Sequence, residues 1–301
     1  MAQLFVPLTG GFRAVTGSGY NTYGESLERP LWRGSEIGLC DTFPDVLGAV
    51  SESEYYDWNM GVHHPLYKEG GPEWCRFHDP DPAVREAALL TARRSAQEAH
   101  HLGVRYILFH FPWPALHRAA DWYFTTEPVG LAAWPSEQAI YDWSRRCFET
   151  FASIQASELI RVVLEIDGPN PYFFDGELYS RLFEEYPDLS LCVDTGRLGL
   201  LARTHGQDPL ALARRWLPWA RYMHLSTSLW DQQGRFRNHI PTTAEHTVER
   251  WPPVTPAADI ARMIVAAQPR CTIVLEHDPQ AVSPEELERA HAFAASLVEG
   301  T

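Results

Sequence analysis

Residues 161–166 read RVVLEI, and three later stretches have the same form: LSLCVD at 189–194, RYMHL at 221–225 and CTIVLE at 271–276. Each stretch is a short, nearly continuous apolar run with an acidic or imidazole side chain at or near its end. Runs of this kind are expected of parallel strands that are buried on both faces. The four stretches therefore bear on the fold and on the chemistry together.

Four more apolar runs precede them, at Gln3–Leu8, Glu36–Cys40, Asn59–His64 and Arg105–Phe111. Helical patterns with clear start signals lie between many of the runs. The predicted starts are Asp81-Pro82, Ser136, Asp208-Pro209, Thr255-Pro256 and Ser283-Pro284. Eight strands interleaved with helices in 301 residues predict a single (β/α)₈ TIM barrel of the α/β class. A doubly wound open sheet is the alternative, but no G-x-G-x-x-G follows the first strand.

The chain is expected to form one domain over residues 1–301, because no repeat, low-complexity segment or linker interrupts it. The stretch Gly10–Trp32 has little regular pattern. We expect it to form a long loop at the barrel mouth or an interface arm.

Composition excludes several classes of protein. Hydrophobic residues make up 45% and charged residues 21%, which is an ordinary globular balance. The formal net charge of −14 argues against nucleic-acid binding, since that function needs a basic footprint. Five widely spaced cysteines without a C-x-x-C pair argue against a disulfide framework. We expect no membrane span and no signal peptide, and hence a cytoplasmic protein.

The strand ends supply candidate metal ligands. Glu165, Asp194, His224 and Glu276 each end an apolar run, and the C-terminal strand ends of a barrel face one another across one mouth. Two Glu, one Asp and one His form a ligand set that suits Mn²⁺, Mg²⁺, Co²⁺ or Zn²⁺. Any single member could instead cap a helix or pair with an arginine. A buried, unpaired carboxylate costs several kcal/mol, however, and convergence on one cation offsets that cost for all four.

Two earlier strands add histidines. GVHHP contains His63 and His64, and YILFH ends in His110. Adjacent strand residues point to opposite faces, so only one of His63 and His64 can face the mouth. These histidines are candidates for a second metal or for substrate contact, and the alternative is an ordinary role in the core or at the rim.

The order of the strand-end motifs resembles that of the xylose-isomerase-like TIM-barrel superfamily. The motifs are H-H-P, F-H, L-E, V-D-T-G, M-H-L and L-E, and the resemblance extends from about Glu36 to Glu276. That group includes ketose 3-epimerases, hydroxypyruvate isomerases and the endonuclease IV branch. The resemblance implies that Glu165, Asp194, His224 and Glu276 form the shared metal site. It selects His63 over His64, and it implies that His63, His110 and Glu165 hold another zinc in the nuclease branch. In the loop after the seventh strand, Arg235 and His239 resemble the G-R segment of hydroxypyruvate isomerases and the D-x-H segment of endonuclease IV.

The chain departs from the family pattern at two positions. Arg197 stands where both branches commonly have a histidine, and Arg237 stands where a D-x-H ending at His239 would begin. A third zinc is therefore not expected. An arginine facing the mouth would favour an anionic substrate bound by Arg197 or Arg235, because guanidinium binds carboxylate and phosphate in bidentate fashion. The alternative is that Arg197 pairs with a neighbouring acid.

The first functional hypothesis is a divalent-metal isomerase or epimerase of a small sugar, sugar acid or sugar phosphate. It would act through an enediolate, with Glu165 and Glu276 as acid and base. The second is a two-metal hydrolase such as a phosphoesterase, and the third is a barrel that binds a ligand without catalysis. A small molecule is the expected partner in each case. Relatives often dimerise, so a homodimer is also an option.

Overall fold

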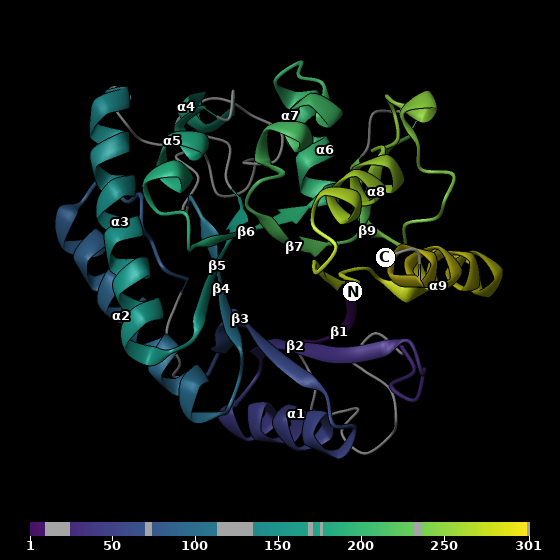
Figure 1. The fold of residues 1–301 in the computed structure, drawn as a ribbon, viewed down its shortest axis with the longest axis horizontal. Helices are drawn as coiled ribbons and strands as arrows, with labels where there is room; N and C mark the ends of the chain where they lie inside the picture. Colours follow the sequence, from purple (N-terminus) through teal and green to yellow (C-terminus); the bar gives the residue numbers. More distant parts are fainter. Residues whose placement is uncertain are drawn as a thin grey trace.

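Eight parallel strands close into a barrel in the computed structural model, which describes residues 1–9, 25–69, 74–112, 135–167, 171–174, 177–231 and 236–299 (Figure 1). The order around the barrel is β1-β10-β7-β6-β5-β4-β3-β2. The strands are β1 (Gln3–Thr9), β2 (Trp32–Cys40), β3 (Asn59–Tyr67), β4 (Tyr106–Phe111), β5 (Arg161–Ile166), β6 (Ser190–Asp194), β7 (Ala220–His224) and β10 (Thr272–Val274). The predicted TIM barrel is confirmed.

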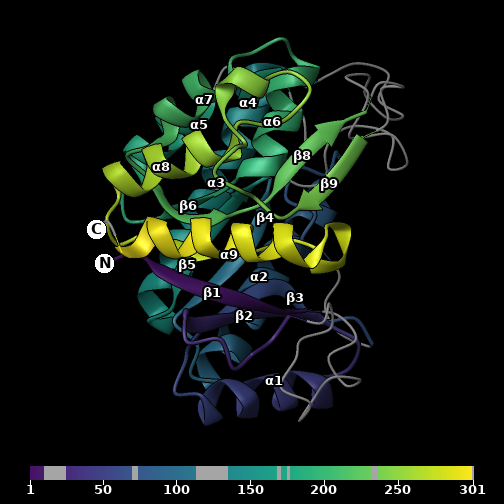
Figure 2. The same cartoon turned by 90° about the vertical axis from the view of Figure 1, so that its right-hand side faces the viewer.

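Helices surround the barrel on the outside (Figures 1 and 2). They are α1 (Phe43–Tyr55), α2 (Pro82–His101), α3 (Glu137–Glu158), α4 (Pro171–Phe174), α5 (Glu177–Glu185), α6 (Thr195–Thr204), α7 (Pro209–Trp216), α8 (Ala257–Ala267) and α9 (Pro284–Glu299). Four predicted starts are confirmed by capping, since Asp81, Ser136, Asp208 and Ser283 each accept a hydrogen bond from a first-turn backbone N–H. Of the described helices, none has both the length and the apolar character needed to cross a membrane.

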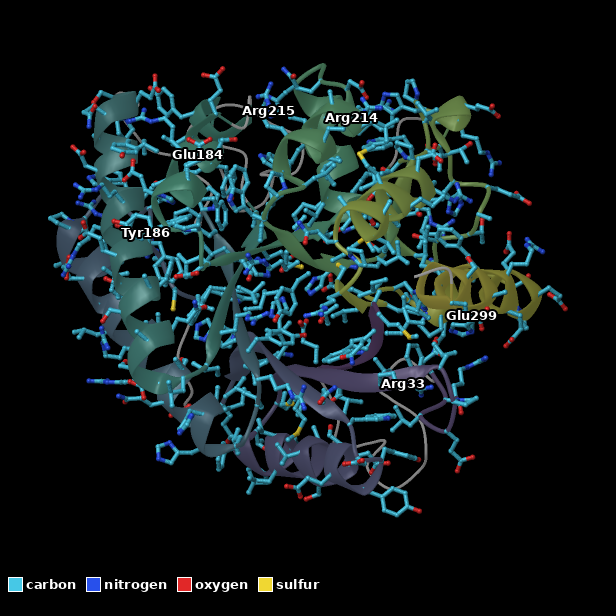
Figure 3. The ribbon with its side chains drawn as sticks, viewed as in Figure 1. Arg33, Glu184, Tyr186, Arg214, Arg215 and Glu299 are labelled. Atoms are coloured by element: carbon cyan, nitrogen blue, oxygen red, sulfur yellow. The ribbon has the colours of Figure 1, made fainter. Side chains whose placement is uncertain are left out.

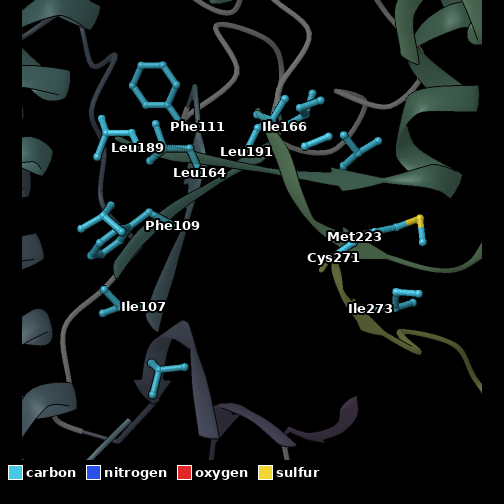
Figure 4. Close-up of a cluster of buried hydrophobic side chains, with 14 of the residues drawn as sticks. Ile107, Phe109, Phe111, Leu164, Ile166, Leu189, Leu191, Met223, Cys271 and Ile273 are labelled. Carbon is cyan, nitrogen blue, oxygen red and sulfur yellow. The ribbon is translucent and has the colours of Figure 1, made fainter. Parts of the chain in front are cut away.

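Side-chain alternation along the strands creates two layers of core. On β4, Ile107, Phe109 and Phe111 point outward into the layer between strands and helices, where Leu164 and Ile166 of β5 join them (Figure 4). The opposite faces of the strands fill the barrel interior. Every second residue of a strand faces the barrel interior, so a polar side chain enters the barrel only from one of these inward-facing positions.

The structure differs from the prediction at three elements. β2 begins at Trp32 rather than Glu36, where the predicted irregular segment Gly10–Trp32 ends; residues 10–24 of that segment lie outside the described ranges. β10 ends at Val274, two residues before Glu276. After β7 the chain forms an antiparallel hairpin of β8 (Thr227–Trp230) and β9 (Phe236–Ile240), where a loop was expected.

Candidate metal centre

The candidate site lies where the inward-facing positions of the strands reach the C-terminal mouth. The last interior core residues on five strands are Leu108, Val163, Cys192, Tyr222 and Val274. Two residues after each of these, in the same order, stand His110, Glu165, Asp194, His224 and Glu276. The alternation of side chains therefore brings the first four to the inside of the mouth, and Glu276 reaches it from the turn that follows β10.

Three of the predicted ligands form a compact cluster. His224 Nδ1 lies 2.9 Å from Glu276 Oε2 and 3.6 Å from Glu165 Oε1. One ligand atom from each of the three residues lies within 4.8 Å of the others. Glu165 and His224 are fully buried, whereas the Glu276 side chain is 27% exposed. Bonds to divalent metals are about 2.0–2.6 Å long, so atoms at this spacing can share one ion.

A second cluster shares Glu165 with the first. Oε2 of Glu165 lies 3.4 Å from His63 Nε2 and 3.1 Å from His110 Nε2, and the two ring nitrogens are 3.1 Å apart. His63 thus lies in the mouth, while His64 faces away and contacts the buried Cys75 thiol at 3.3 Å. The carboxylate of Glu165 stands between the two clusters, with one oxygen toward each.

Asp194 lies beside these clusters and is held by Arg197. Its Oδ1 accepts a hydrogen bond of 2.9 Å from the Arg197 backbone N–H and so caps α6. The Arg197 side chain is buried, with NH1 3.1 Å from Glu165 Oε1 and 3.0 Å from Asp167 Oδ2, and Nε 3.6 Å from Asp194 Oδ2. Of the two roles that the sequence left open for Arg197, these contacts match pairing with neighbouring acids. Arg235 lies outside the described residues.

Two buried acids at the site were missed by the sequence analysis. Glu36 on β2 has Oε1 3.1 Å from His224 Nε2, and the Tyr106 hydroxyl donates a 2.8 Å hydrogen bond to Oε2. Asp167 contacts both His110 Nδ1 and Arg197. Asp167 stands two residues after Glu165, so the alternation of β5 was an available signal. Glu36 was placed at the start of its strand, where an acid is usually solvated.

The position of Glu36 gives the two ring nitrogens of His224 different roles. A carboxylate beside Nε2 favours the proton on that nitrogen, which directs the Nδ1 lone pair toward Glu165 and Glu276. Carboxylate–histidine pairs of this kind orient metal-ligating imidazoles and raise their basicity. Glu36 is therefore suited to hold His224 in the form that binds a cation.

Burial and mutual charge set the protonation states. Burial disfavours the charged imidazole of His110, but Glu165 and Asp167 outweigh it and raise its pKa to about 9. Burial also raises the carboxyl pKa of Glu276, yet the nearby His224 lowers it to about 2. The pKa of Glu165 falls well below its ordinary value for the same kind of reason, with Arg197 the largest opposing charge. For Asp194 burial prevails, and its pKa is raised.

A cavity of about 350 Å³ opens over Glu276 and His63. His239 on β9 lines it together with Asn238, and its Nδ1 lies 3.1 Å from the Glu276 carbonyl oxygen. The backbone of His239 has φ 53°, in the left-handed region that non-glycine residues rarely adopt. The unpredicted β8–β9 hairpin is thus the element that brings His239 to the mouth.

Comparisons with known proteins place the fold but not the reaction. No family model matches the sequence, and no significant match is found among curated proteins. The IolI protein with a bound zinc atom is similar in structure, with a TM-score of 0.61, 11% identity and coverage of 99% of this chain and 98% of that one. Mannonate dehydratase from Streptococcus suis has a TM-score of 0.60 at 12% identity, covering 100% and 94%. The 3-keto-D-glucoside 4-epimerase of E. coli has a TM-score of 0.57 at 10% identity, covering 99% of each chain.

At these identities the comparisons establish the fold alone. The chain has the fold of the xylose isomerase-like TIM-barrel proteins, as the strand-end motifs predicted. Solved structures of this fold include one in complex with magnesium, with a TM-score of 0.52 and 15% identity.

Proposed function

We propose that this chain is a divalent-metal-dependent isomerase or epimerase of a small sugar, acting through an enediolate. The observation that carries the proposal is the convergence of Glu165, His224 and Glu276 beside a cavity of about 350 Å³. A cavity of this size is within the range of small-molecule sites. Sugar epimerases and a sugar-acid dehydratase among the proteins of similar fold support the same class of substrate.

The donor atoms fit a cation. Both carboxylate oxygens of Glu165, both ring nitrogens of His224 and Oε2 of Glu276 are buried and have no aligned hydrogen bond within the described ranges. They nevertheless lie close together, which is the arrangement of ligands that point at a common centre. Glu165, His224 and Glu276 would hold the ion. Asp194 remains the fourth proposed ligand, and Arg197 beside it would have to release Oδ2.

When bound, the ion would polarise the carbonyl group of the sugar. Glu276 is the best-placed proton acceptor of the three, because its side chain is partly exposed at the cavity whereas Glu165 and His224 are fully buried. It would take the proton from the carbon next to the carbonyl. In an isomerase it would return the proton to the neighbouring carbon, and in an epimerase a second group would protonate the same carbon from the opposite face. Glu165, fully buried beneath it, is the second proposed acid–base group.

The contacts of Arg197 favour a neutral sugar over a sugar acid or sugar phosphate. Its guanidinium is engaged by Glu165, Asp167 and Asp194, so the fork that would bind an anion is directed at carboxylates of the protein. A role in holding Glu165 ionised is the simpler one, since the Arg197 guanidinium lowers the pKa of that carboxyl group.

Glu276→Gln tests the proposal. The amide keeps an oxygen donor but cannot exchange a proton, so we expect turnover to fall by roughly 10²–10⁴-fold while metal affinity changes much less. The assay loads the enzyme with Mn²⁺, offers a panel of ketoses and aldoses in D₂O, and follows deuterium at the α-carbon by NMR. The matched control is Glu184→Gln on the outer face of α5 (Figure 3), which should leave turnover unchanged. No exchange with any sugar in the wild type, or full activity in Glu276→Gln, would overturn the proposal.

A two-metal hydrolase is the second candidate, favoured by the cluster of His63, His110 and Glu165. His110→Gln distinguishes the two functions. In a two-metal enzyme it removes one bound ion and abolishes cleavage of a phosphodiester such as bis(p-nitrophenyl) phosphate. In the isomerase, the ion at Glu165, His224 and Glu276 remains, and no phosphodiester is cleaved by the wild type.

A further inference from the structure

A second group of metal-ligating side chains is buried outside the barrel mouth. Glu25 precedes β2, His277 follows β10, and His291 lies on α9, so the three residues come from segments far apart in the sequence. Their exposed fractions are 4%, 5% and 3%. α9 runs across the outside of the barrel beside β1 (Figure 2), and its His291 side chain contacts Glu25.

Both imidazoles present the same ring atom to the same carboxylate. His291 Nε2 lies 3.0 Å from Glu25 Oε1, and His277 Nε2 lies 3.6 Å from Glu25 Oε2. One ligand atom from each residue lies within 4.8 Å of the other two. Among the residues that the structure describes, neither ring nitrogen of His291 makes an aligned hydrogen bond, and nor does Nδ1 of His277. Donor atoms at this spacing, two ring nitrogens facing one carboxylate, are close enough for one cation to be bound between them.

The surroundings hold the donor atoms in place. Arg29 Nε lies 3.2 Å from Glu25 Oε1, and its guanidinium also binds Glu288 at 2.7 Å. A carboxylate can accept from an arginine on one oxygen and bind a metal through the other, so Arg29 orients Glu25 rather than blocking it. The indole of Trp32 packs edge-on against the His291 ring, with centroids 6.2 Å apart.

We propose that Glu25, His277 and His291 bind a structural divalent cation of the Zn²⁺ class, separate from the ion proposed at the mouth. Two imidazole nitrogens and one carboxylate oxygen are donors that zinc takes, and a water would complete a tetrahedron. The ion would link α9, the end of β10 and the segment that enters β2. Since His277 also lines the mouth cavity, the link would brace the wall next to Glu276.

Zinc analysis in a background without the mouth ligands tests the proposal. The double variant Glu165→Gln/His224→Gln removes donors from both mouth clusters and leaves the second group intact. After loading with ZnCl₂ and removal of free metal, we expect it to retain one zinc per chain by elemental analysis. Adding His291→Gln should remove that zinc, whereas adding His100→Gln, at an exposed position on α2, should not. No zinc in the double variant, or equal zinc with and without His291→Gln, would overturn the proposal.

Anomalous scattering from zinc-soaked crystals of the unmodified protein keeps the test valid if the variants do not fold. We expect a peak at the zinc edge about 2.0–2.1 Å from Nε2 of His277 and of His291. A peak at the mouth with none between these two histidines would overturn the second site and leave the proposed function intact. A peak between His277 and His291 with none at the mouth would overturn the proposed function and leave the second site intact.

Discussion

Replacing Arg197 with methionine removes a buried cation from among three carboxylates. Its NH1 lies 3.1 Å from Glu165 and 3.0 Å from Asp167, its Nε lies 3.6 Å from Asp194, and the residue is 4% exposed. Removing one partner from a buried ion pair costs about 3–5 kcal/mol, because the remaining charge is left without compensation. The three contacts share one guanidinium, so we expect a single loss of that size in the metal-free protein rather than three.

Urea unfolding followed by tryptophan fluorescence, in EDTA and again with Mn²⁺, measures this loss. We expect Mn²⁺ to recover part of the unfolding free energy, because a divalent ion near Glu165 replaces some of the missing positive charge. The matched control is Arg214→Met on the outer helix α7 (Figure 3), an exposed position where the change should stay within about 0.5 kcal/mol. A loss below about 1 kcal/mol for Arg197→Met in EDTA would refute the view that Arg197 balances the buried acids.

Three further predictions concern other positions. Glu36→Gln should weaken metal binding by roughly 10–100-fold, measured by competition with a chelating dye, because the His224 ring loses its carboxylate partner. Burial, and then Arg250, lower the pKa of His246 to about 4. The stability given by the neutral imidazole is therefore present above pH 6.5 and is lost as the pH falls toward 4. We expect the unfolding free energy, measured in urea, to fall by up to ~3 kcal/mol over this range in the wild type, and this loss should be absent in His246→Asn. Gly61→Ala should cost about 1–3 kcal/mol of unfolding free energy, because a Cβ there would lie 2.0 Å from the Tyr106 ring.

The barrel could be predicted because its strands are buried on both faces. Continuous apolar runs such as Arg161–Ile166 need no partner information to be recognised, and all eight predicted runs became barrel strands. The β8–β9 hairpin could not be predicted in the same way. Thr227 and Ser228 are polar but fully buried, where the Thr227 hydroxyl bonds Thr242 and that of Ser228 bonds Asn238. Their strand character depends on these tertiary contacts and not on a local pattern.

The same distinction applies to the sites. The mouth residues follow from strand alternation, so Glu165 and His224 could be expected to meet before any coordinates were known. The partners of Arg197 could not be predicted, because the sequence does not say which way a long side chain turns at the start of α6. The group of Glu25, His277 and His291 was missed for a related reason. The group depends on how α9 packs across the barrel, and the periodicity of a single segment does not predict a contact between distant segments.

The charge balance at the mouth supports the proposed cation. Among the described residues, Glu165, Asp167 and Asp194 surround the guanidinium of Arg197, while Glu36 and Glu276 contact the two ring nitrogens of His224. In the metal-free protein, protonated imidazoles supply more positive charge, since carboxylates raise the pKa of His110 to about 9 and that of His224 well above its ordinary value. A metal ligand must be a deprotonated imidazole, so a divalent ion at Glu165, His224 and Glu276 would replace the proton on Nδ1 of His224. The ion would bring two positive charges where the proton brought one, and this added positive charge would keep the carboxyl groups at the mouth, including Glu276, ionised.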